Sequence, residues 1–260
     1  MRQSYVLQIA CAAGLLGLVG TASGAPPVPT PAPSKEADAA TPAIDPQAVA
    51  ALNKMGAYLR TLTNFEIKAD TTTDTVLDNG QKVQFAGKNN YKVRRPDGFV
   101  ISVADDRKVR QFYYDGKSFT VFSPRMGFYA TVAAPPTIHE VLKKVYDRFG
   151  IELPLEDLFR WGTPEDHHDD LTSGYTIGYA KINGVDAVQY AFRQGDIDWQ
   201  VWIQQGDKPL PLKAVITTTS DEAQPQYSAT LSWNTSPAFA KDTFTFKPPA
   251  NAKPITIATR

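Results

Sequence analysis

The sequence has almost no cysteine: Cys11 is the single one among 260 residues. A lipoprotein signal would place a leucine three residues before the lipidated cysteine, where this chain has Gln8. Cys11 also lies in a segment with the features of a cleaved signal, so we expect a mature chain without cysteine. This excludes disulfides, thiolate metal sites and cysteine nucleophiles, and the protein must be stabilised by its core alone.

An excess of charge of one sign is also missing. The chain has 27 Lys and Arg residues against 27 Asp and Glu residues, and no run of one sign stands out. Binding to nucleic acid or to an acidic membrane surface would be expected to require a basic patch. Neither partner is therefore indicated.

Motifs typical of enzymes are missing as well. The segment Gly-Lys-Ser-Phe-Thr at 116–120 lacks the second glycine of a nucleophile elbow, and Gln111 occupies the place of the first glycine of a phosphate-binding loop. The cluster Glu165–Asp170 has carboxylates and imidazoles that could bind a divalent ion. Because adjacent side chains point apart, we interpret it as a solvated acidic loop with at most weak surface binding. We expect no enzyme activity, no cofactor and no metal site.

Two segments precede the expected fold. A basic Met1-Arg2, an apolar run from Tyr5 to Gly20 and the small residues Ser23-Gly24-Ala25 predict a secretory signal at 1–25. A retained membrane anchor is the alternative, but the apolar run is short for a span. Residues 26–43 are rich in proline and alanine and predict a disordered tether. The sequence thus predicts a periplasmic protein with one domain at 44–260 and no stable membrane span after cleavage.

Helical periodicity is found in two regions. Asp45-Pro46 is a capping residue followed by proline at the first helical position, and apolar residues then recur every three or four positions, which predicts a helix over 46–62. The same spacing returns from Ile138 to Phe149 and ends at Gly150, followed by a shorter helical stretch at 153–161. The second region predicts a helical insertion between two runs of strands.

Elsewhere the apolar residues alternate, with turns such as Asn79-Gly80 between the segments. In the central hairpin at 197–219, Trp199, Val201 and Ile203 share one face. We count about eleven strands in a meander with one apolar face. The predicted fold class is α+β: a strongly curved antiparallel sheet, an incomplete β-barrel, lidded by an N-terminal helix and a helical insertion.

Three segments carry a family resemblance: the strand Trp199–Ile203, the turn and strand entry Pro209–Lys213, and the closing segment Phe244–Pro249. With the helices and strands around them, over about 46–256, the chain resembles the periplasmic lipoprotein-carrier superfamily (LolA/LolB-like). Within that superfamily it most resembles a domain-of-unknown-function family of predicted periplasmic proteins. The resemblance implies an eleven-stranded half-barrel whose concave apolar face accepts acyl chains. No position of this sequence can be matched to the lid-locking arginine of the carriers.

A sheet of this size has more concave surface than the two helical regions can cover, which favours an apolar cavity over a filled core. We expect its ligand-binding side to be lined by Tyr190, Phe192, Trp199, Val201, Ile203, Tyr227, Leu231 and Trp233. Trp202 falls on the outer face, where it is either covered by another part of the chain or marks a contact surface.

The predicted function is that of a non-enzymatic periplasmic binding protein. It would hold a hydrophobic ligand, an acyl chain or the lipid moiety of a lipoprotein, in transport through the envelope. The alternative is an interaction or sensor protein with a collapsed cavity, which engages another envelope protein through a sheet edge or exposed aromatic side chains.

Overall fold

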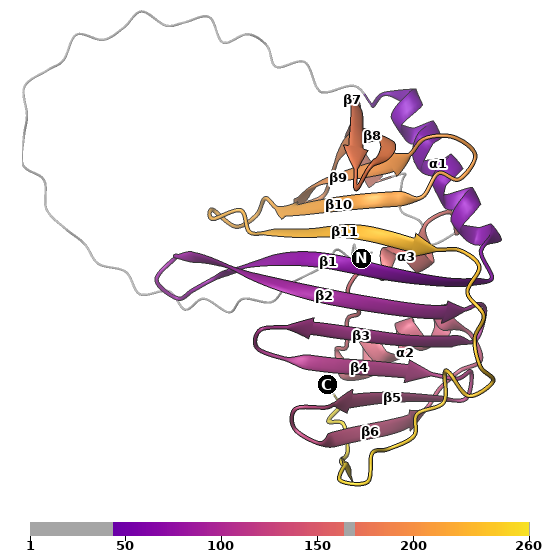
Figure 1. Cartoon of the computed structure of the whole chain (residues 1–260). Helices are drawn as coiled ribbons and strands as arrows, with labels where there is room; N and C mark the ends of the chain where they lie inside the picture. The colour runs from indigo at the N-terminus through magenta and orange to yellow at the C-terminus, as the bar shows by residue number, and fades with distance from the viewer. Residues whose placement is uncertain (1–43, 164–169, 260) are drawn as a thin grey trace, which may run out of the picture.

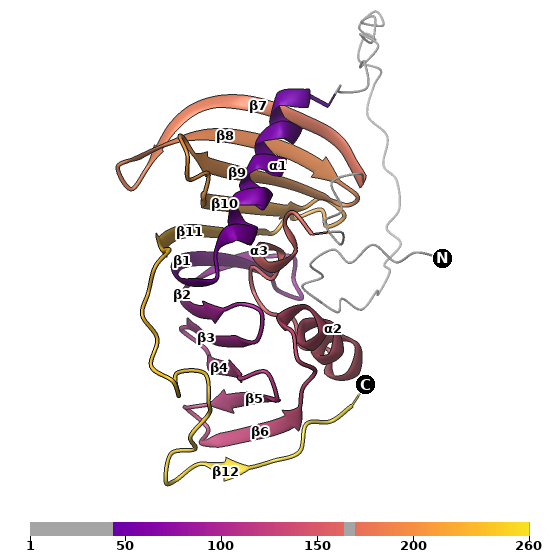
Figure 2. The same ribbon diagram turned by 90° about the vertical axis from the view of Figure 1, so that its right-hand side faces the viewer.

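The computed structural model describes residues 44–163 and 170–259. The predicted signal and tether at 1–43 lie outside the described residues. One large, strongly curved sheet forms the body of the protein, and its two ends do not meet (Figures 1 and 2). The strand order is β12-β6-β5-β4-β3-β2-β1-β11-β10-β9-β8-β7. The predicted fold class, a curved and unclosed antiparallel sheet with an N-terminal helix and a helical insertion, is confirmed.

The elements alternate along the chain as the periodicity predicts. The helices are α1 (Pro46–Thr61), α2 (Ile138–Phe149) and α3 (Asp157–Arg160). The first run of strands is β1 (Asn64–Val76), β2 (Lys82–Arg94), β3 (Gly98–Asp105), β4 (Val109–Tyr114), β5 (Ser118–Ser123) and β6 (Phe128–Ala133). The second run is β7 (Leu171–Ile182), β8 (Val185–Gln194), β9 (Ile197–Gln204), β10 (Pro211–Thr218), β11 (Gln226–Asn234) and β12 (Lys253–Pro254).

The two-residue strand β12 is not among the eleven predicted strands. It pairs in parallel with β6, whereas all the other strand pairs are antiparallel. A strand this short that contains a proline has no alternating pattern to reveal it. Within the described residues, no helix has both the length and the apolar character needed to cross a membrane.

Helix α1 begins where the sequence predicts it. The Asp45 side chain accepts a hydrogen bond from the Gln47 backbone N–H at 2.8 Å, and Pro46 occupies the first turn. Its apolar stripe, Ala48, Leu52, Met55 and Leu59, is buried against the sheet. Figure 2 shows α1 lying across the half of the sheet that runs from β7 to β11, while α2 and α3 lie over the other half.

The core lies between these helices and the concave face. Alternate residues of β1, Phe65, Ile67 and Ala69, are buried there, and Ile67 stands opposite Tyr91 of β2 and Trp233 of β11. Because side chains alternate along a strand, these residues share the concave face. The residues between them on β1 are predominantly charged and face outward.

The segment after β11 covers part of the outer face. Phe246 contacts the rings of Tyr113, Phe122 and Tyr129, with centroid separations of 5.1, 5.4 and 5.1 Å. Phe244 is 2% exposed, and the Arg94 guanidinium lies over its ring. The closing Phe-Thr-Phe segment therefore packs as a strap across the outside of the sheet and joins no strand.

Helix α1 touches the loop after α3 through two glycines. A Cβ built on Gly56 would lie 2.8 Å from the Gly162 backbone nitrogen, and a Cβ on Gly162 would lie 2.7 Å from the Gly56 carbonyl carbon. Real Cβ atoms do not approach backbone this closely, so neither position accepts a side chain without movement. This contact brings the two helical regions together over the core.

We expect Gly56→Ala to destabilise the protein by about 1–3 kcal/mol, because the added methyl forces α1 away from Gly162. The sign of this stability change is informative, because alanine in a helix interior is otherwise favoured over glycine by about 1 kcal/mol. Chemical denaturation measures the free energy of unfolding, and Asn53→Ala on the exposed side of α1 is the control. A Gly56→Ala protein more stable than the unsubstituted chain would contradict the close contact.

Candidate ligand-binding site

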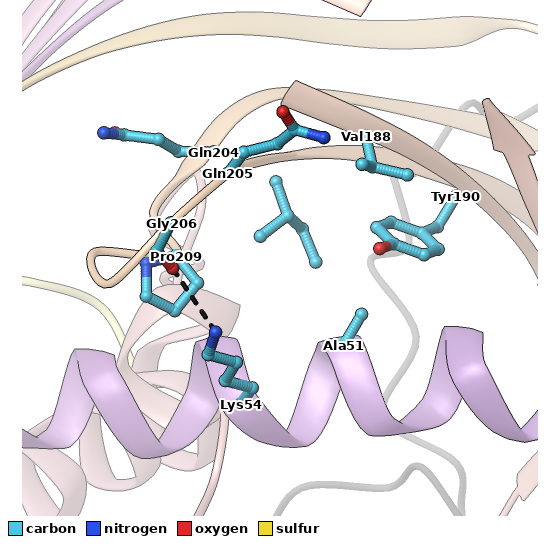
Figure 3. Close-up of a pocket in the computed structure, with 9 residues that line it drawn as sticks. Ala51, Lys54, Val188, Tyr190, Gln204, Gln205, Gly206 and Pro209 are labelled. Atoms are coloured by element: carbon cyan, nitrogen blue, oxygen red, sulfur yellow. Dashed lines mark hydrogen bonds between the residues drawn. The ribbon is translucent and has the colours of Figure 1, made fainter. Parts of the chain in front are cut away.

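A cavity of about 430 Å³ lies between α1 and the concave face of β8 and β9 (Figure 3). Its walls come from α1, from two neighbouring strands and from the turn between β9 and β10. It is lined by Ala51, Lys54, Val188, Tyr190, Ile203, Gln204, Gln205, Gly206 and Pro209. The volume falls within the range of small-molecule sites, about 300–1,000 Å³.

The apolar wall follows from the register of the strands. Val188 of β8 stands opposite Ile203 of β9, and Tyr190 stands opposite Val201, so all four side chains lie on the concave face. Ala51 faces them from α1 (Figure 3). Because alanine is small, the space between helix and sheet at this point stays open.

The mouth of the cavity is polar. Lys54 is exposed, and its Nζ donates a hydrogen bond of 3.3 Å to the Gly206 carbonyl in the turn between β9 and β10 (Figure 3). Gly206 has a φ of +93°, which glycine adopts without strain. The Lys54 side chain therefore bridges α1 and the sheet across one end of the cavity.

Two of the eight predicted ligand-binding residues line this cavity: Tyr190 and Ile203. The others pack elsewhere on the same concave face. Val201 and Leu231 are buried in the core, and Phe192 stacks on Trp199 with a centroid separation of 4.5 Å. The remaining two are Tyr227, which is buried, and Trp233, which is half-buried.

The cavity thus lies beside β8 and β9, and most of the predicted lining residues pack elsewhere on the concave face. Sequence reasoning missed Ala51 and Lys54 of α1 as lining residues. They are spaced three apart and so share one face of the helix. This spacing can be read from the sequence, but it does not show which strands of the sheet face these two residues.

Two buried polar atoms on the concave face lack hydrogen-bond partners among the described residues: Trp199 Nε1 and Tyr227 Oη. Burial raises the pKa of Tyr227, and the nearby Asn89 side chain offsets part of the rise. Trp233, in contrast, donates from Nε1 to the Pro211 carbonyl at 2.7 Å. With Asn89 beside Tyr227, Trp199 Nε1 is the clearer case, and an unpaired buried donor costs about 1–3 kcal/mol.

Arg95 joins the helices to the sheet. Its Nη1 donates to the Leu59 carbonyl in the last turn of α1 at 3.2 Å, and its Nη2 to the Leu158 carbonyl of α3 at 3.4 Å. The guanidinium also lies 5.7 Å from the centre of the Phe65 ring. Burial, and then the charge of Arg60, lower the pKa of Arg95. One side chain thereby holds two of the covering helices.

Trp202 is 8% exposed, and the Lys213 ammonium lies 4.8 Å from the centre of its ring. We expected this outer-face residue either to be covered by another part of the chain or to mark a contact surface, and it is covered. Trp202 belongs to the buried hydrophobic cluster and offers no free contact surface.

The part of the chain that the structure describes contains no group of three or more His, Cys, Asp or Glu side chains placed to hold a metal ion. The predicted acidic loop falls at Glu165–Asp170, of which 165–169 lie outside the described residues.

The β7 end of the sheet carries exposed apolar side chains. Tyr175, Ile177 and Tyr179 are 40%, 54% and 87% exposed. Ile44 forms a parallel bridge with Gly174 on this edge, and the Asp45 N–H donates to the Gly174 carbonyl at 2.9 Å. The edge therefore already accepts backbone pairing over a short stretch.

Comparisons with known proteins place the chain in a wider context. A model of the family described as "Predicted periplasmic protein (DUF2092)" matches residues 48–258. No curated protein gives a match.

Several solved structures are similar to the chain. An uncharacterised conserved protein from Thermus thermophilus has 8% identity and a TM-score of 0.45, over 81% of this chain and 99% of that one. The Mycobacterium tuberculosis lipoprotein LppX has 13% identity and a TM-score of 0.46, over 75% and 98%. A LolA superfamily protein from Nitrosomonas europaea has 11% identity and a TM-score of 0.33, over 76% and 97%.

Proposed function

The chain belongs to the DUF2092 family of predicted periplasmic proteins, and we propose that it is a non-enzymatic binding protein that holds a hydrophobic ligand in the periplasm. The ligand is an acyl chain or the lipid moiety of a lipoprotein, and it lies between α1 and the strands β8 and β9. The observation that carries the proposal is the open cavity lined by Ala51, Val188, Tyr190 and Ile203 between α1 and the concave face.

The driving force is burial of the chain's apolar surface. Each CH₂ group transferred from water contributes about 0.8 kcal/mol, so even part of an acyl chain supplies several kcal/mol. Ordering of the chain and lost translational freedom oppose this gain. An apolar wall with a few polar groups at its mouth is the usual build of such sites.

Exchange of the ligand would require α1 to move away from the sheet. Three polar ties hold this part of α1 to the sheet: Thr176 Oγ1 donates to Asp45 Oδ2 at 2.6 Å, the Asp45 N–H donates to the Gly174 carbonyl at 2.9 Å, and Lys54 bonds to the Gly206 carbonyl. At the other end of α1, Arg95 holds the last turn. Opening the cavity, which lies beside the middle of α1, would therefore require the ties at the N-terminal end of the helix to break while Arg95 holds its C-terminal end.

Native mass spectrometry of protein purified from a bacterial envelope under mild conditions tests the proposal. We expect the folded protein to carry a lipid-sized mass that is released on denaturation, and the delipidated protein to take up a fluorescent fatty acid. Repeated absence of bound lipid together with no uptake of the fluorescent fatty acid would reject the proposal.

A second function is favoured by the β7 edge. Its exposed Tyr175, Ile177 and Tyr179 lie on the last strand of the described sheet, and they suit an extended apolar segment of an envelope protein that adds to the sheet as a further strand. Unpaired strand edges are ordinarily protected by charges or by bulges. This edge has two bulges but only one charged residue, Lys181.

If the edge binds a partner strand, Ile177→Lys should abolish capture of that partner, because a charge then stands where an apolar contact is required. Crosslinking in the living cell through a photoreactive residue at Tyr175 measures the capture, and fatty-acid uptake measured in parallel shows that the cavity is unaffected. Equal crosslinking with and without Ile177→Lys would argue against the edge as a docking site.

A further inference from the structure

We propose that the ligand of the cavity is an amphiphile with an anionic head group, and that Lys54 Nζ binds this head group at the mouth. The inference rests on the proposed function, since it requires that the cavity hold an acyl chain. It adds the chemical class of the ligand and the residue that selects it.

The first observation is the arrangement of the apolar and the charged residue that α1 contributes to the cavity lining. Ala51 and Lys54 are separated by three positions on α1, which places their Cβ atoms about 5–6 Å apart on one face of the helix. Ala51 faces the apolar wall, and Lys54 reaches over the mouth (Figure 3). A molecule bound along this face therefore meets apolar surface first and then a positive charge.

The second observation is that Lys54 forms no ion pair within the ranges 44–163 and 170–259. Among the described residues, the bond from Lys54 goes to a neutral carbonyl and no carboxylate lies within ion-pair distance. Several other lysines of the sheet and helices have carboxylate partners: Lys82, Lys88, Lys92, Lys143 and Lys181. The Lys54 ammonium at the cavity mouth is thus held only by a neutral acceptor, which an anion can replace.

An anion would replace the Gly206 carbonyl as the acceptor. Hydrogen bonds between an ammonium group and an anion are shorter and about twice as strong as bonds between neutral groups. Gln204 and Gln205 also line the cavity, but Figure 3 shows their side-chain amides on the sheet side, away from the Lys54 ammonium. Without ligand, Lys54 closes the mouth against Gly206; with ligand, the same ammonium holds the head group.

A carboxylate and a phosphate monoester are both anionic head groups that the Lys54 ammonium can bind. The following experiment distinguishes between them. The probes are hexadecanoate, hexadecyl phosphate and the neutral hexadecanol, measured by displacement of a fluorescent fatty acid. The variants are Lys54→Met, which keeps most of the apolar stem but removes the charge, and Lys88→Met, a control at an exposed lysine on the outer face.

We expect Lys54→Met to weaken binding of one or both anionic probes about tenfold, while hexadecanol changes less than twofold and Lys88→Met has no effect. A tenfold loss corresponds to about 1.4 kcal/mol. Loss for hexadecanoate alone identifies a carboxylate head, and loss for hexadecyl phosphate alone identifies a phosphate head.

Equal weakening of all three probes would overturn the inference, because Lys54 would then be only a latch that holds α1. Unchanged binding of both anionic probes would overturn it too. If the unsubstituted protein binds none of the probes, the proposed function itself fails. Circular dichroism of each variant establishes that the fold is intact.

Discussion

Replacing Ala51 with tryptophan is expected to abolish uptake of a fluorescent fatty acid, with a loss of at least about a hundredfold in affinity. The indole would project from α1 into the space between Ala51, Val188, Tyr190 and Ile203. A ligand chain that loses this space loses its apolar contacts, each CH₂ of which contributes about 0.8 kcal/mol. The protein should stay folded, because the indole fills an existing cavity and displaces no packed side chain.

Ala50→Trp is the matched control. Ala50 is the preceding residue of the same helix and is exposed, so the same substitution there adds an indole outside the cavity. We expect it to leave fatty-acid uptake unchanged. If both variants bind the fatty acid as well as the unsubstituted chain does, the ligand occupies another part of the molecule.

Replacing Arg95 with methionine is expected to lower the free energy of unfolding by about 2–4 kcal/mol and to speed the release of bound fatty acid. The guanidinium donates to carbonyls of α1 and α3, and hydrogen bonds to charged groups each contribute about 1.5–3 kcal/mol. Without them the last turn of α1 loses its tie to the end of β2, and the helix that covers the cavity opens more often.

Arg95→Lys should recover only part of the stability, because a single ammonium cannot span two carbonyls as the planar guanidinium does. Arg110→Met, at an exposed position of β4, is the control for loss of an arginine charge. Chemical denaturation gives the stability, and stopped-flow transfer of the fluorescent fatty acid to vesicles gives the release rate. Arg95→Met with unchanged stability and release would show that Arg95 does not hold the helices.

Much of the fold was predictable because its signals are local. The turns Asn79-Gly80 and Asn183-Gly184 mark hairpins, and both glycines have positive φ, +79° and +82°. Helix α1 begins at the predicted Asp45-Pro46 pair. Membership of a predicted periplasmic family and the periplasmic location were likewise predicted, and the family match confirms both.

The place of the cavity was not predictable, because it depends on contacts between distant segments. Alternation correctly assigned Tyr190, Trp199 and Val201 to one face, but it could not say which of them a helix would cover. That outcome depends on where α1 crosses the sheet, which the Gly56–Gly162 contact and Arg95 determine. For the same reason the sequence left the covering of Trp202 undecided.

A crystal structure of the protein with a fatty acid brominated near the end of its chain would show directly where the ligand lies. We expect an anomalous bromine peak between α1 and β8–β9, in contact with Tyr190 or Ile203, and a head group beside Lys54. A bromine peak under α2, on the concave side of β3–β6, or crystals grown in excess ligand with no peak at all, would contradict this expectation.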